Sequence, residues 1–460
     1  MNIVLIVVDT LRADHLSCYN YFRETCPTMD KIACEGILFE NFYASGIPTG
    51  PGFTSIITGL YPVNHKYYIT PWDIPNTYQL DDNIPVLAEI LWDHGYVTAA
   101  VDNLINFRSH MKQFVRGFEY YLNPTKSSRW IHHCVIADQV NKKVIPWIKE
   151  HSYERFFLFI HYWDPHTPYN QPEGYRHVFK HKKMSINNLK VEVEKAKAGY
   201  EYIPGWGKID EIIEGNENKS INLYDGEILY VDNAIAEVVE ALKDEGILND
   251  TLLIITSDHG EQLGQHGIWG HAGLHESVIR IPLIIRYPEK LPKGLRVKQL
   301  AQQVDILPTI LDIAHVKTDF KFDGESLMRL IKGDNIRDFI ICETWGERCI
   351  IYKNWKLIVH YEAELKVLHE IFPKPFQPHH FKPIKTILEK ITIIGNRGYE
   401  LYNIDEDPME VINLAEEERD KLKELERMLD DWVKAKVGKN DPMDQLERYT
   451  QPQPLEYQRI

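Results

Sequence analysis

The run Ile3-Val4-Leu5-Ile6-Val7-Val8, which ends at Asp9, is the stretch of sequence that decides the fold. A continuous apolar, β-branched run is typical of a strand that is buried on both faces of a parallel sheet. The same pattern returns at residues 156–160 and 251–256, and polar side chains follow each run. Helical patterns separate these strands, at residues 84–94 and 228–242. This alternation predicts a doubly wound α/β sheet.

From about residue 323 the sequence changes to shorter segments, at residues 339–342, 348–352, 355–359 and 400–403. Their alternation of apolar and polar residues predicts a small antiparallel sheet. A charged helical pattern follows at residues 416–432. We therefore expect three parts: a large α/β domain at residues 1–320 with a surface insertion at 180–219, a small α+β domain at 321–436, and an extended tail at 437–460.

The composition is that of a compact globular protein. Hydrophobic residues make up 44% and charged residues 26% of the 460 residues, so the chain can bury a sizeable core. The 52 Lys and Arg against 67 Asp and Glu give a formal net charge of −15. Such a surface has no general attraction for nucleic acids or anionic membranes, and we expect neither as a partner.

The N-terminus and the cysteines indicate a cytoplasmic protein. No basic segment precedes the first apolar run, so we expect neither a signal peptide nor a membrane anchor. The six cysteines include no Cys-x-x-Cys pair. Cys18, Cys26 and Cys34 recur at intervals of eight, but no clustered His or Cys nearby completes a tetrahedral set. We therefore expect no structural metal at these three residues.

Polar residues at the strand ends supply the candidate chemistry. Asp9 ends the first strand, Asp258-His259 follow a late strand, and Thr49 lies on a turn before a helical pattern. Such donors suit a divalent cation, and a hydroxyl beside a cation and at a helix N-terminus is activated as a nucleophile. Each residue also has an ordinary alternative: Asp9 as a helix cap, Thr49 as a turn residue, and Asp258 and His259 in loop hydrogen bonds.

The chain resembles the sulfatase branch of the alkaline phosphatase superfamily in a series of motifs between residue 2 and about residue 415. These motifs are DTLRADHL at 9–16, TGLYP at 58–62, HYWDPHTPY at 161–169, SDHGE at 257–261, GQHG at 264–267, RIPLII at 280–285, VDILPT at 304–309 and ELYNIDEDP at 400–408. The resemblance implies a catalytic α/β domain with a large mixed, mostly parallel sheet flanked by helices. It also implies a smaller C-terminal antiparallel sheet domain.

Two departures from the family pattern decide the expected chemistry. The sulfatase signature Cys/Ser-x-Pro-x-Arg falls on residues 49–53, where Pro51 is kept, Thr49 is the nucleophile and Phe53 replaces the arginine. Sulfatases of this family oxidise the Cys or Ser to formylglycine. The β-carbon of Thr49 carries a methyl group, so the same oxidation would give a ketone. We therefore expect no formylglycine.

The metal ligands implied by the resemblance also differ from the sulfatase pattern. Sulfatases usually hold calcium with paired aspartates and often Asp-Asn, but here Thr10 follows Asp9 and His259 follows Asp258. An imidazole ligand shifts the preference from calcium toward Mn²⁺, Zn²⁺ or Fe²⁺. Asp-His together with a Thr nucleophile is more similar to the phosphodiesterase, phosphonate monoesterase and phosphotransferase relatives.

These observations predict a metal-dependent hydrolase of phosphate esters, with a phosphodiester or a phosphonate monoester favoured. In the expected mechanism Thr49 binds a metal held by Asp9, Asp258 and His259 and attacks phosphorus. A covalent phospho-threonine forms, and water then hydrolyses it. The expected partner is a small anionic ester.

Three further residues are assigned by family analogy. His166 and His271 are expected to stabilise the phosphoryl oxygens and to protonate the leaving oxygen. Together with Asp164 they could hold a second metal or contact the substrate. Arg12 and Asp14 follow the first ligand so closely that they either orient it or form an ion pair that fixes the loop.

Three other functions remain open at this point. A sulfatase could work with an unmodified threonine, and a transferase could pass the phospho group from Thr49 to an alcohol. A binding protein that has lost catalysis is the third alternative, although the retained ligand set argues against it. The tail at residues 437–460 could also join two copies of the chain into a homo-oligomer.

Overall fold

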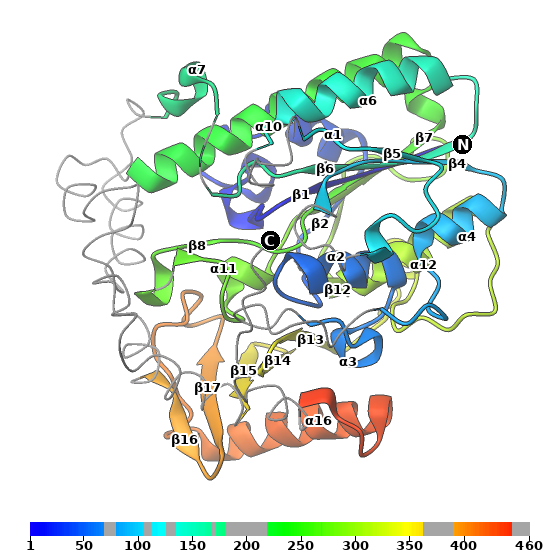
Figure 1. Ribbon diagram of the computed structural model, residues 1–460. Helices are drawn as coiled ribbons and strands as arrows, with labels where there is room; N and C mark the ends of the chain where they lie inside the picture. The colour runs from blue at the N-terminus through cyan, green and yellow to red at the C-terminus, as the bar shows by residue number, and fades with distance from the viewer. Residues whose placement is uncertain are drawn as a thin grey trace, which may run out of the picture.

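The computed structural model describes residues 1–68, 80–104, 112–125, 135–167, 169, 171–179, 219–267, 269–361 and 390–443. Nearly all of the expected surface insertion at residues 180–219 lies outside the described residues. So does most of the expected tail at residues 437–460. The described part forms two sheets with helices packed around them (Figure 1).

The larger sheet has eight strands in the order β11-β2-β10-β7-β1-β6-β4-β5. In chain order its strands are β1 (Asn2–Val8), β2 (Ile37–Phe39), β4 (Val97–Val101), β5 (Tyr120–Leu122), β6 (Phe156–Tyr162), β7 (Thr251–Thr256), β10 (Leu283–Arg286) and β11 (Leu295–Val297). Only β10 among these strands runs antiparallel to its neighbours. The predicted mixed, mostly parallel sheet is therefore confirmed.

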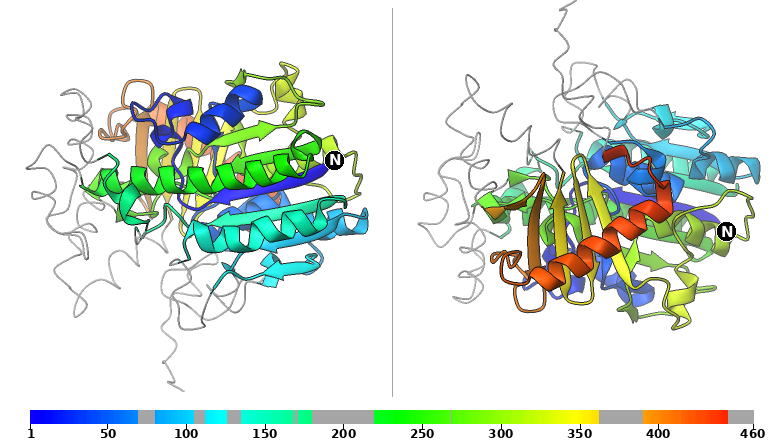
Figure 2. Two further views of the ribbon diagram at one scale, coloured as in Figure 1. Left: turned by 90° about the horizontal axis from the view of Figure 1, so that it is seen from above. Right: turned by 90° about the horizontal axis from the view of Figure 1, so that it is seen from below.

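Helices cover both faces of the large sheet. In Figure 1, α1 (Pro27–Glu35), α6 (Ala137–His151) and α10 (Lys219–Asp244) lie on one face, and Figure 2 shows α6 and α10 side by side. The other face carries α2 (Thr49–Thr58), α4 (Leu87–Asp93) and α12 (Ile306–Ala314). Four short α-helices lie in the connecting segments: α3 (Pro62–His65), α7 (Glu173–Arg176), α11 (Glu276–Ile279) and α13 (Met328–Ile331). The described connections also contain the 3₁₀ turns η1 (Ala13–His15), η2 (Ser17–Tyr19), η3 (Lys112–Phe114), η5 (Leu248–Asp250), η6 (Gln265–Gly267) and η7 (Gln303–Asp305).

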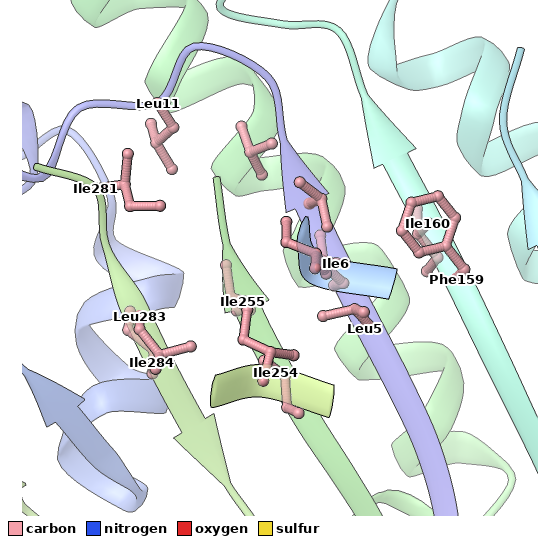
Figure 3. Packing of buried hydrophobic residues seen from close by; sticks show 14 of the residues in the cluster. Leu5, Ile6, Leu11, Phe159, Ile160, Ile254, Ile255, Ile281, Leu283 and Ile284 are labelled. Atoms are coloured by element: carbon pink, nitrogen blue, oxygen red, sulfur yellow. The ribbon is translucent and has the colours of Figure 1, made fainter. Parts of the chain in front are cut away.

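The central strands are apolar because both of their faces are covered. Every residue of β1, β6 and β7 is buried. Figure 3 shows how their side chains pack, with Leu5 and Ile6 of β1 beside Ile254 and Ile255 of β7. Because β1 pairs in parallel with both β6 and β7, the carboxyl ends of all three strands meet at one edge. The residues that follow these strands therefore lie together.

The smaller sheet is antiparallel, as the alternating segments predicted. Its order is β13-β14-β15-β17-β16, formed by β13 (Phe339–Thr344), β14 (Glu347–Tyr352), β15 (Trp355–His360), β16 (Thr392–Ile394) and β17 (Arg397–Asn403). The charged helix α16 (Arg419–Val437) crosses this sheet (Figure 2). It buries Leu422, Leu425 and Leu429 against the sheet. Two small ribbons complete the description, β3 (Phe42–Tyr43) with β12 (Ala301–Gln302) and β8 (Gln262–Leu263) with β9 (Trp269–Gly270).

A buried arginine anchors the start of the tail to the small sheet. Arg348 of β14 donates from Nε to Glu343 Oε1 over 2.7 Å and from Nη2 to Asp441 Oδ1 over 2.7 Å. Met443, two residues later, is also buried in the core of this sheet. The first described residues of the expected tail therefore pack within their own chain.

Candidate active site

Three of the predicted metal-binding residues converge at the carboxyl end of the large sheet. Asp9 follows β1, and Asp258 and His259 follow β7. His259 Nε2 lies 4.0 Å from Asp9 Oδ1 and 3.3 Å from Asp258 Oδ2, and all three side chains are fully buried. Their donor atoms lie within 4.8 Å of one another. Among the described residues, the only other group of this kind contains Cys18, Cys26 and Asp30.

Three of the four carboxylate oxygens in this cluster accept no hydrogen bond from a described residue, although His161 Nε2 lies 3.4 Å from Asp9 Oδ2. Neither oxygen of Asp9 accepts a hydrogen bond from a described residue, and the same is true of Asp258 Oδ2. Burial raises the pKa of both groups, and for Asp258 the pKa rises to about 6. Burying unpaired carboxylates is costly, and a divalent cation between them removes that cost. The donor set therefore fits the divalent metal that the family implies.

His259 is oriented as a metal ligand should be. Its Nδ1 lies 2.8 Å from the carbonyl oxygen of Gly260, which can only accept, so Nδ1 carries the proton. The lone pair is then on Nε2, which faces the two carboxylates. Burial, and secondarily the charge of His271, lower the pKa of His259 to about 4, so the ring is neutral at physiological pH.

Thr49 stands beside this cluster. It is the first residue of α2, and its Oγ1 lies 3.2 Å from His259 Nε2. Three residues later, a Cβ on Gly52 would lie 2.8 Å from the carbonyl oxygen of Asp258. The helix can approach the Asp258 loop this closely because position 52 has no side chain. The structure thus brings Asp9, Thr49, Asp258 and His259 together.

Thr10 occupies the position of the second aspartate in the sulfatase pattern, and its backbone is strained. Its φ is 56°, a left-handed conformation that a β-branched residue rarely adopts. Its amide donates to Asp258 Oδ1 over 3.2 Å, and its carbonyl oxygen accepts from the Tyr224 hydroxyl over 2.6 Å. These bonds hold the turn that follows β1 against the Asp258 loop.

Two more predicted residues extend the site in a row of imidazoles. The His271 ring lies 4.7 Å from the His259 ring, and the His166 ring lies 5.2 Å from the His271 ring, centre to centre. His271 Nδ1 faces the buried carboxylate of Glu261 at 3.5 Å. Burial lowers the pKa of His271, but the Glu261 carboxylate outweighs burial and raises the pKa overall. His271 is thus disposed to hold a proton.

Asp164 does not join these histidines. Its carboxylate contacts Glu227 of α10 and the backbone of Ala137 in α6, and burial raises its pKa to about 6. No donor cluster of the described residues combines it with His166 or His271. The structure therefore does not assemble the second metal site that the motif led us to expect at Asp164.

The Arg12–Asp14 ion pair connects the loop after β1 to the backbone at Glu261. Arg12 donates to the Asp14 carboxylate through Nε and Nη2, over 2.9 and 2.7 Å, and through Nη1 to the carbonyl oxygen of Glu261 over 3.0 Å. Of the two interpretations that the sequence left open, this geometry matches the ion pair that fixes the loop.

Comparison with known sequences identifies the family. The sequence profile of the sulfatase family matches residues 1–316. The chain belongs to the sulfatase family. The profile of the N-sulphoglucosamine sulphohydrolase C-terminal region matches residues 264–437, which include the small sheet of this sulfatase-family protein.

The relatives of this sulfatase-family chain act on more than one kind of ester. It is 24% identical to the multifunctional alkaline phosphatase superfamily protein PehA of Trinickia caryophylli, covering 90% of this chain and 91% of that protein. It is 26% identical to an arylsulfatase of Clostridium perfringens, covering 93% of each. The crystal structure of the phosphonate monoester hydrolase of Agrobacterium radiobacter matches with a TM-score of 0.71 at 20% identity, covering 94% of this chain and 95% of that chain.

These matches confirm a sulfatase-like hydrolase of the alkaline phosphatase superfamily, whose enzymes use divalent metal ions. The metal, the ester class and the roles of single residues remain predictions. None of the helices in the described part of the chain is long and apolar enough to cross a membrane.

His161 is a site residue that sequence reasoning missed. It lies inside β6, is fully buried, and places Nδ1 2.8 Å from Asp102 Oδ1 and Nε2 3.4 Å from Asp9 Oδ2. Burial alone would lower its pKa, but Asp102 and Asp9 raise the pKa to about 9. The ring of Phe53 packs edge-on against His161 with ring centres 4.7 Å apart. The signal available in the sequence was a single histidine that interrupts a buried strand.

Proposed function

We propose that this sulfatase-family protein hydrolyses phosphate esters, preferably phosphodiesters or phosphonate monoesters, with the unmodified hydroxyl of Thr49 as nucleophile. The proposal rests on one observation: Thr49 Oγ1 lies 3.2 Å from His259 Nε2, beside two buried carboxylates of which three oxygens accept no hydrogen bond from a described residue. Because the Thr49 β-carbon carries a methyl group, its oxidation cannot give formylglycine, on which the usual sulfatase chemistry depends. The nucleophile must then be the hydroxyl itself.

Asp9, Asp258 and His259 would hold the divalent cation. When bound, it supplies positive charge that favours the ionised hydroxyl and offsets the negative charge of the phosphoryl group. The neutral imidazole of His259 favours Mn²⁺, Zn²⁺ or Fe²⁺ over calcium. The unpaired oxygens of Asp9 and Asp258 supply the negative charge that any of these ions needs.

The protein side of the reaction begins at Thr49. A bond forms between its Oγ1 and phosphorus while the bond from phosphorus to the leaving oxygen breaks. Thr49 opens α2, where the peptide dipoles favour negative charge on Oγ1. The Thr49 proton passes to solvent as the bond to phosphorus forms. Water then attacks the phospho-threonine, so that its hydroxide stays on phosphorus and its second proton returns to Thr49 Oγ1. The product that leaves is a phosphate monoester from a phosphodiester substrate, or the free phosphonate from a phosphonate monoester.

His271 supports the departure of the leaving group. With its Nδ1 facing Glu261, the ring holds a proton that the leaving oxygen can take from Nε2. His166, the next imidazole in the row, donates its Nδ1 proton to the Thr167 carbonyl oxygen, so it would donate to the phosphoryl oxygens from Nε2 in its protonated form. These are the roles that the family resemblance implied for the two residues.

A sulfatase that works without formylglycine is the second candidate. The family profile over residues 1–316 and the likeness to the Clostridium perfringens arylsulfatase favour it. Sulfate and phosphate esters have similar geometry but different charge, so the two candidates differ in substrate preference. A transferase is a third outcome, in which an alcohol replaces water.

A substrate panel tests the proposal directly. The purified protein, loaded with Mn²⁺ or Zn²⁺, is given aryl phosphodiester, phosphonate monoester, phosphomonoester and sulfate ester substrates. We expect turnover of the first two to exceed turnover of the sulfate ester. Acid quenching during turnover should leave a phosphoryl group on the peptide that contains Thr49, detected by mass spectrometry. Sulfate turnover above both phosphate classes would defeat the proposal, and transfer to added alcohols would identify a transferase.

A pair of variants isolates the nucleophile. Thr49→Val removes the hydroxyl and keeps the shape, and we expect kcat/KM to fall by at least about 10³-fold, as for other nucleophile deletions. Thr54→Val is the matched control, because Thr54 lies in the same helix and its hydroxyl donates to the Gly50 carbonyl over 2.7 Å. Its kcat/KM should stay close to that of the parent. Equal activities of the two variants would exclude Thr49 as the nucleophile.

A further inference from the structure

A second donor cluster lies at the start of α1. Cys18, in η2, and Cys26, directly before α1, place their sulfurs 4.0 Å apart. Cys26 Sγ lies 3.2 Å from Asp30 Oδ1, and the donor atoms of all three residues lie within 4.8 Å of one another. From the sequence we expected no metal at these cysteines, because a spacing of eight residues is not a metal-binding motif and Asp30 was not considered as a ligand.

The spacing of these donors matches tetrahedral zinc coordination. With Zn–S bonds of about 2.3 Å and Zn–O bonds of about 2.0 Å, a tetrahedral ion holds two sulfurs about 3.8 Å apart and sulfur and oxygen about 3.5 Å apart. The observed separations of 4.0 and 3.2 Å differ from these values by a few tenths of an ångström. A disulfide needs its sulfurs at about 2.05 Å, which is much farther from the observed spacing.

The surrounding backbone holds the donors in place. The Asp30 amide donates to the Cys26 carbonyl oxygen over 2.8 Å in the first turn of α1, so both side chains project from the same turn. Ser17 Oγ lies 3.2 Å from Cys26 Sγ and is bonded to the Cys26 amide at 3.3 Å. Cys26 is buried, whereas Cys18 and Asp30 are half-buried, so an ion can reach the cluster from solvent.

We propose that Cys18, Cys26 and Asp30 form a second cation site, selective for a thiophilic divalent ion such as Zn²⁺ and separate from the Asp9 cluster. The two sulfurs and one carboxylate oxygen bind the ion, and water takes the fourth position. Each thiol releases its proton to solvent as its sulfur binds, so no oxidant or reductant is involved. The site ties the turn at η2 to the start of α1.

Cadmium separates this site from the active site, because thiolate ligands give an ultraviolet charge-transfer absorption and carboxylate and imidazole ligands do not. The full chain is stripped of metal under reducing conditions and titrated with Cd²⁺, and then with Zn²⁺ in competition. Because the Asp9 cluster can also take up Cd²⁺ without absorbing, we expect the absorption to saturate by two added equivalents per chain and to be displaced by Zn²⁺. The Asp9 cluster contains no sulfur and contributes nothing to the signal.

Matched variants locate the ligands. Cys18→Ser and Cys26→Ser should each abolish the absorption, whereas Cys34→Ser, which alters an exposed cysteine of the same helix, should leave it unchanged. Asp30→Asn keeps both thiols, so it should retain the absorption. We expect it to weaken zinc binding by more than the roughly 10- to 100-fold that loss of an outer-shell partner costs.

Three results would overturn the proposal: no absorption in the parent, an absorption that survives Cys18→Ser, or a Cys18–Cys26 disulfide in the freshly isolated protein by mass spectrometry. Phosphoesterase activity is no part of this readout. The second site can therefore fail while the proposed function stands, and the reverse also holds.

Discussion

The cluster around Arg348 and the cluster around Asp9 are both buried, but they differ in how their charged atoms are satisfied. In the small sheet, the Arg348 guanidinium binds Glu343, Asp441 and the Tyr361 hydroxyl. Glu343 Oε2 also accepts from the Val63 amide over 2.9 Å. At the edge of the large sheet, the equally buried carboxylates of Asp9 and Asp258 retain oxygens that no described residue bonds.

This difference distinguishes a structural cluster from a functional one. The protein itself supplies every partner of Arg348, so that cluster fixes the position of the chain after α16 and needs nothing from outside. The Asp9 cluster is incomplete without a cation, and its burial is a cost that folding alone does not recover. Both clusters bury two carboxylates, but only the Arg348 cluster contains its own cation between them.

The largest effect on stability should come from breaking the satisfied cluster. Arg348→Met leaves the Glu343 and Asp441 carboxylates facing each other without a cation, and we expect the free energy of unfolding to fall by about 3–5 kcal/mol. Metal affinity should not change, because Arg348 does not contact the Asp9 cluster. Chemical denaturation and metal titration measure the two quantities.

Lys421→Met is the control for Arg348→Met, because it breaks a partly exposed ion pair with Glu424 at 2.6 Å. An exposed pair of this kind contributes about 0.5 kcal/mol or less. If the Arg348 variant lost no more stability than the Lys421 variant, the Arg348 cluster would not have the structural role described here.

In metal-free protein, removing a charge from the Asp9 cluster should raise the free energy of unfolding, whereas removing Arg348 lowers it. Burial raises the pKa of Asp258 from 3.8 to about 6, so the metal-free fold binds a proton more tightly than the unfolded chain does. The protonated Asp258 contributes its full stabilisation below about pH 4. This contribution to the free energy of unfolding, about 3 kcal/mol, is lost as the pH rises through about 6. Asp258→Asn removes that loss, so the metal-free variant should be the more stable protein at pH 7.5.

Denaturation of chelator-treated protein between pH 4 and pH 8 measures the effect. Adding Mn²⁺ should reverse the order, because only the parent keeps the ligand. Asp93→Asn, which changes an exposed carboxylate of α4, serves as the control and should shift stability little at any pH. A metal-free Asp258 variant that is less stable than the parent at pH 7.5 would contradict this account.

The sequence was sufficient for the strands that carry the site. The run at Ile3–Val8 and its two counterparts are apolar because both faces of the sheet are covered, and parallel strands bring their ends to one edge. That geometry alone places Asp9 near Asp258 and His259. Thr49 could be added because its turn precedes a helix, as α2 confirms.

Other parts of the site depended on contacts that no local pattern encodes. His161 is held by Asp102, 59 residues earlier in the chain, at the end of β4. Asp164 belongs to the expected motif, yet its carboxylate turns toward Glu227 in a helix more than 60 residues away. Cys18 meets Cys26 because η2 folds back on α1, which the regular spacing of the cysteines did not indicate.

The smallest predicted effect is the loss of metal affinity on replacing His161, which contacts the proposed metal ligand Asp9 without being a ligand itself. Its Nε2 faces Asp9 Oδ2 at 3.4 Å while Asp102 fixes the other side of the ring, so it positions Asp9 for the cation. His161→Gln should weaken Mn²⁺ or Zn²⁺ affinity by about 10- to 100-fold, the usual cost of an outer-shell partner. Equilibrium dialysis measures this without reference to turnover.

If His161 only positions Asp9, its replacement should lower metal affinity but leave the rate at saturating metal nearly unchanged. For His161→Gln, kcat should recover toward the parent value as metal is raised, because the variant loses a support of Asp9 and no group that touches substrate. His151→Gln, which alters a histidine paired with Glu154 at the end of α6, should change neither quantity. Unchanged metal affinity in the His161 variant would mean that Asp9 is held by its backbone alone.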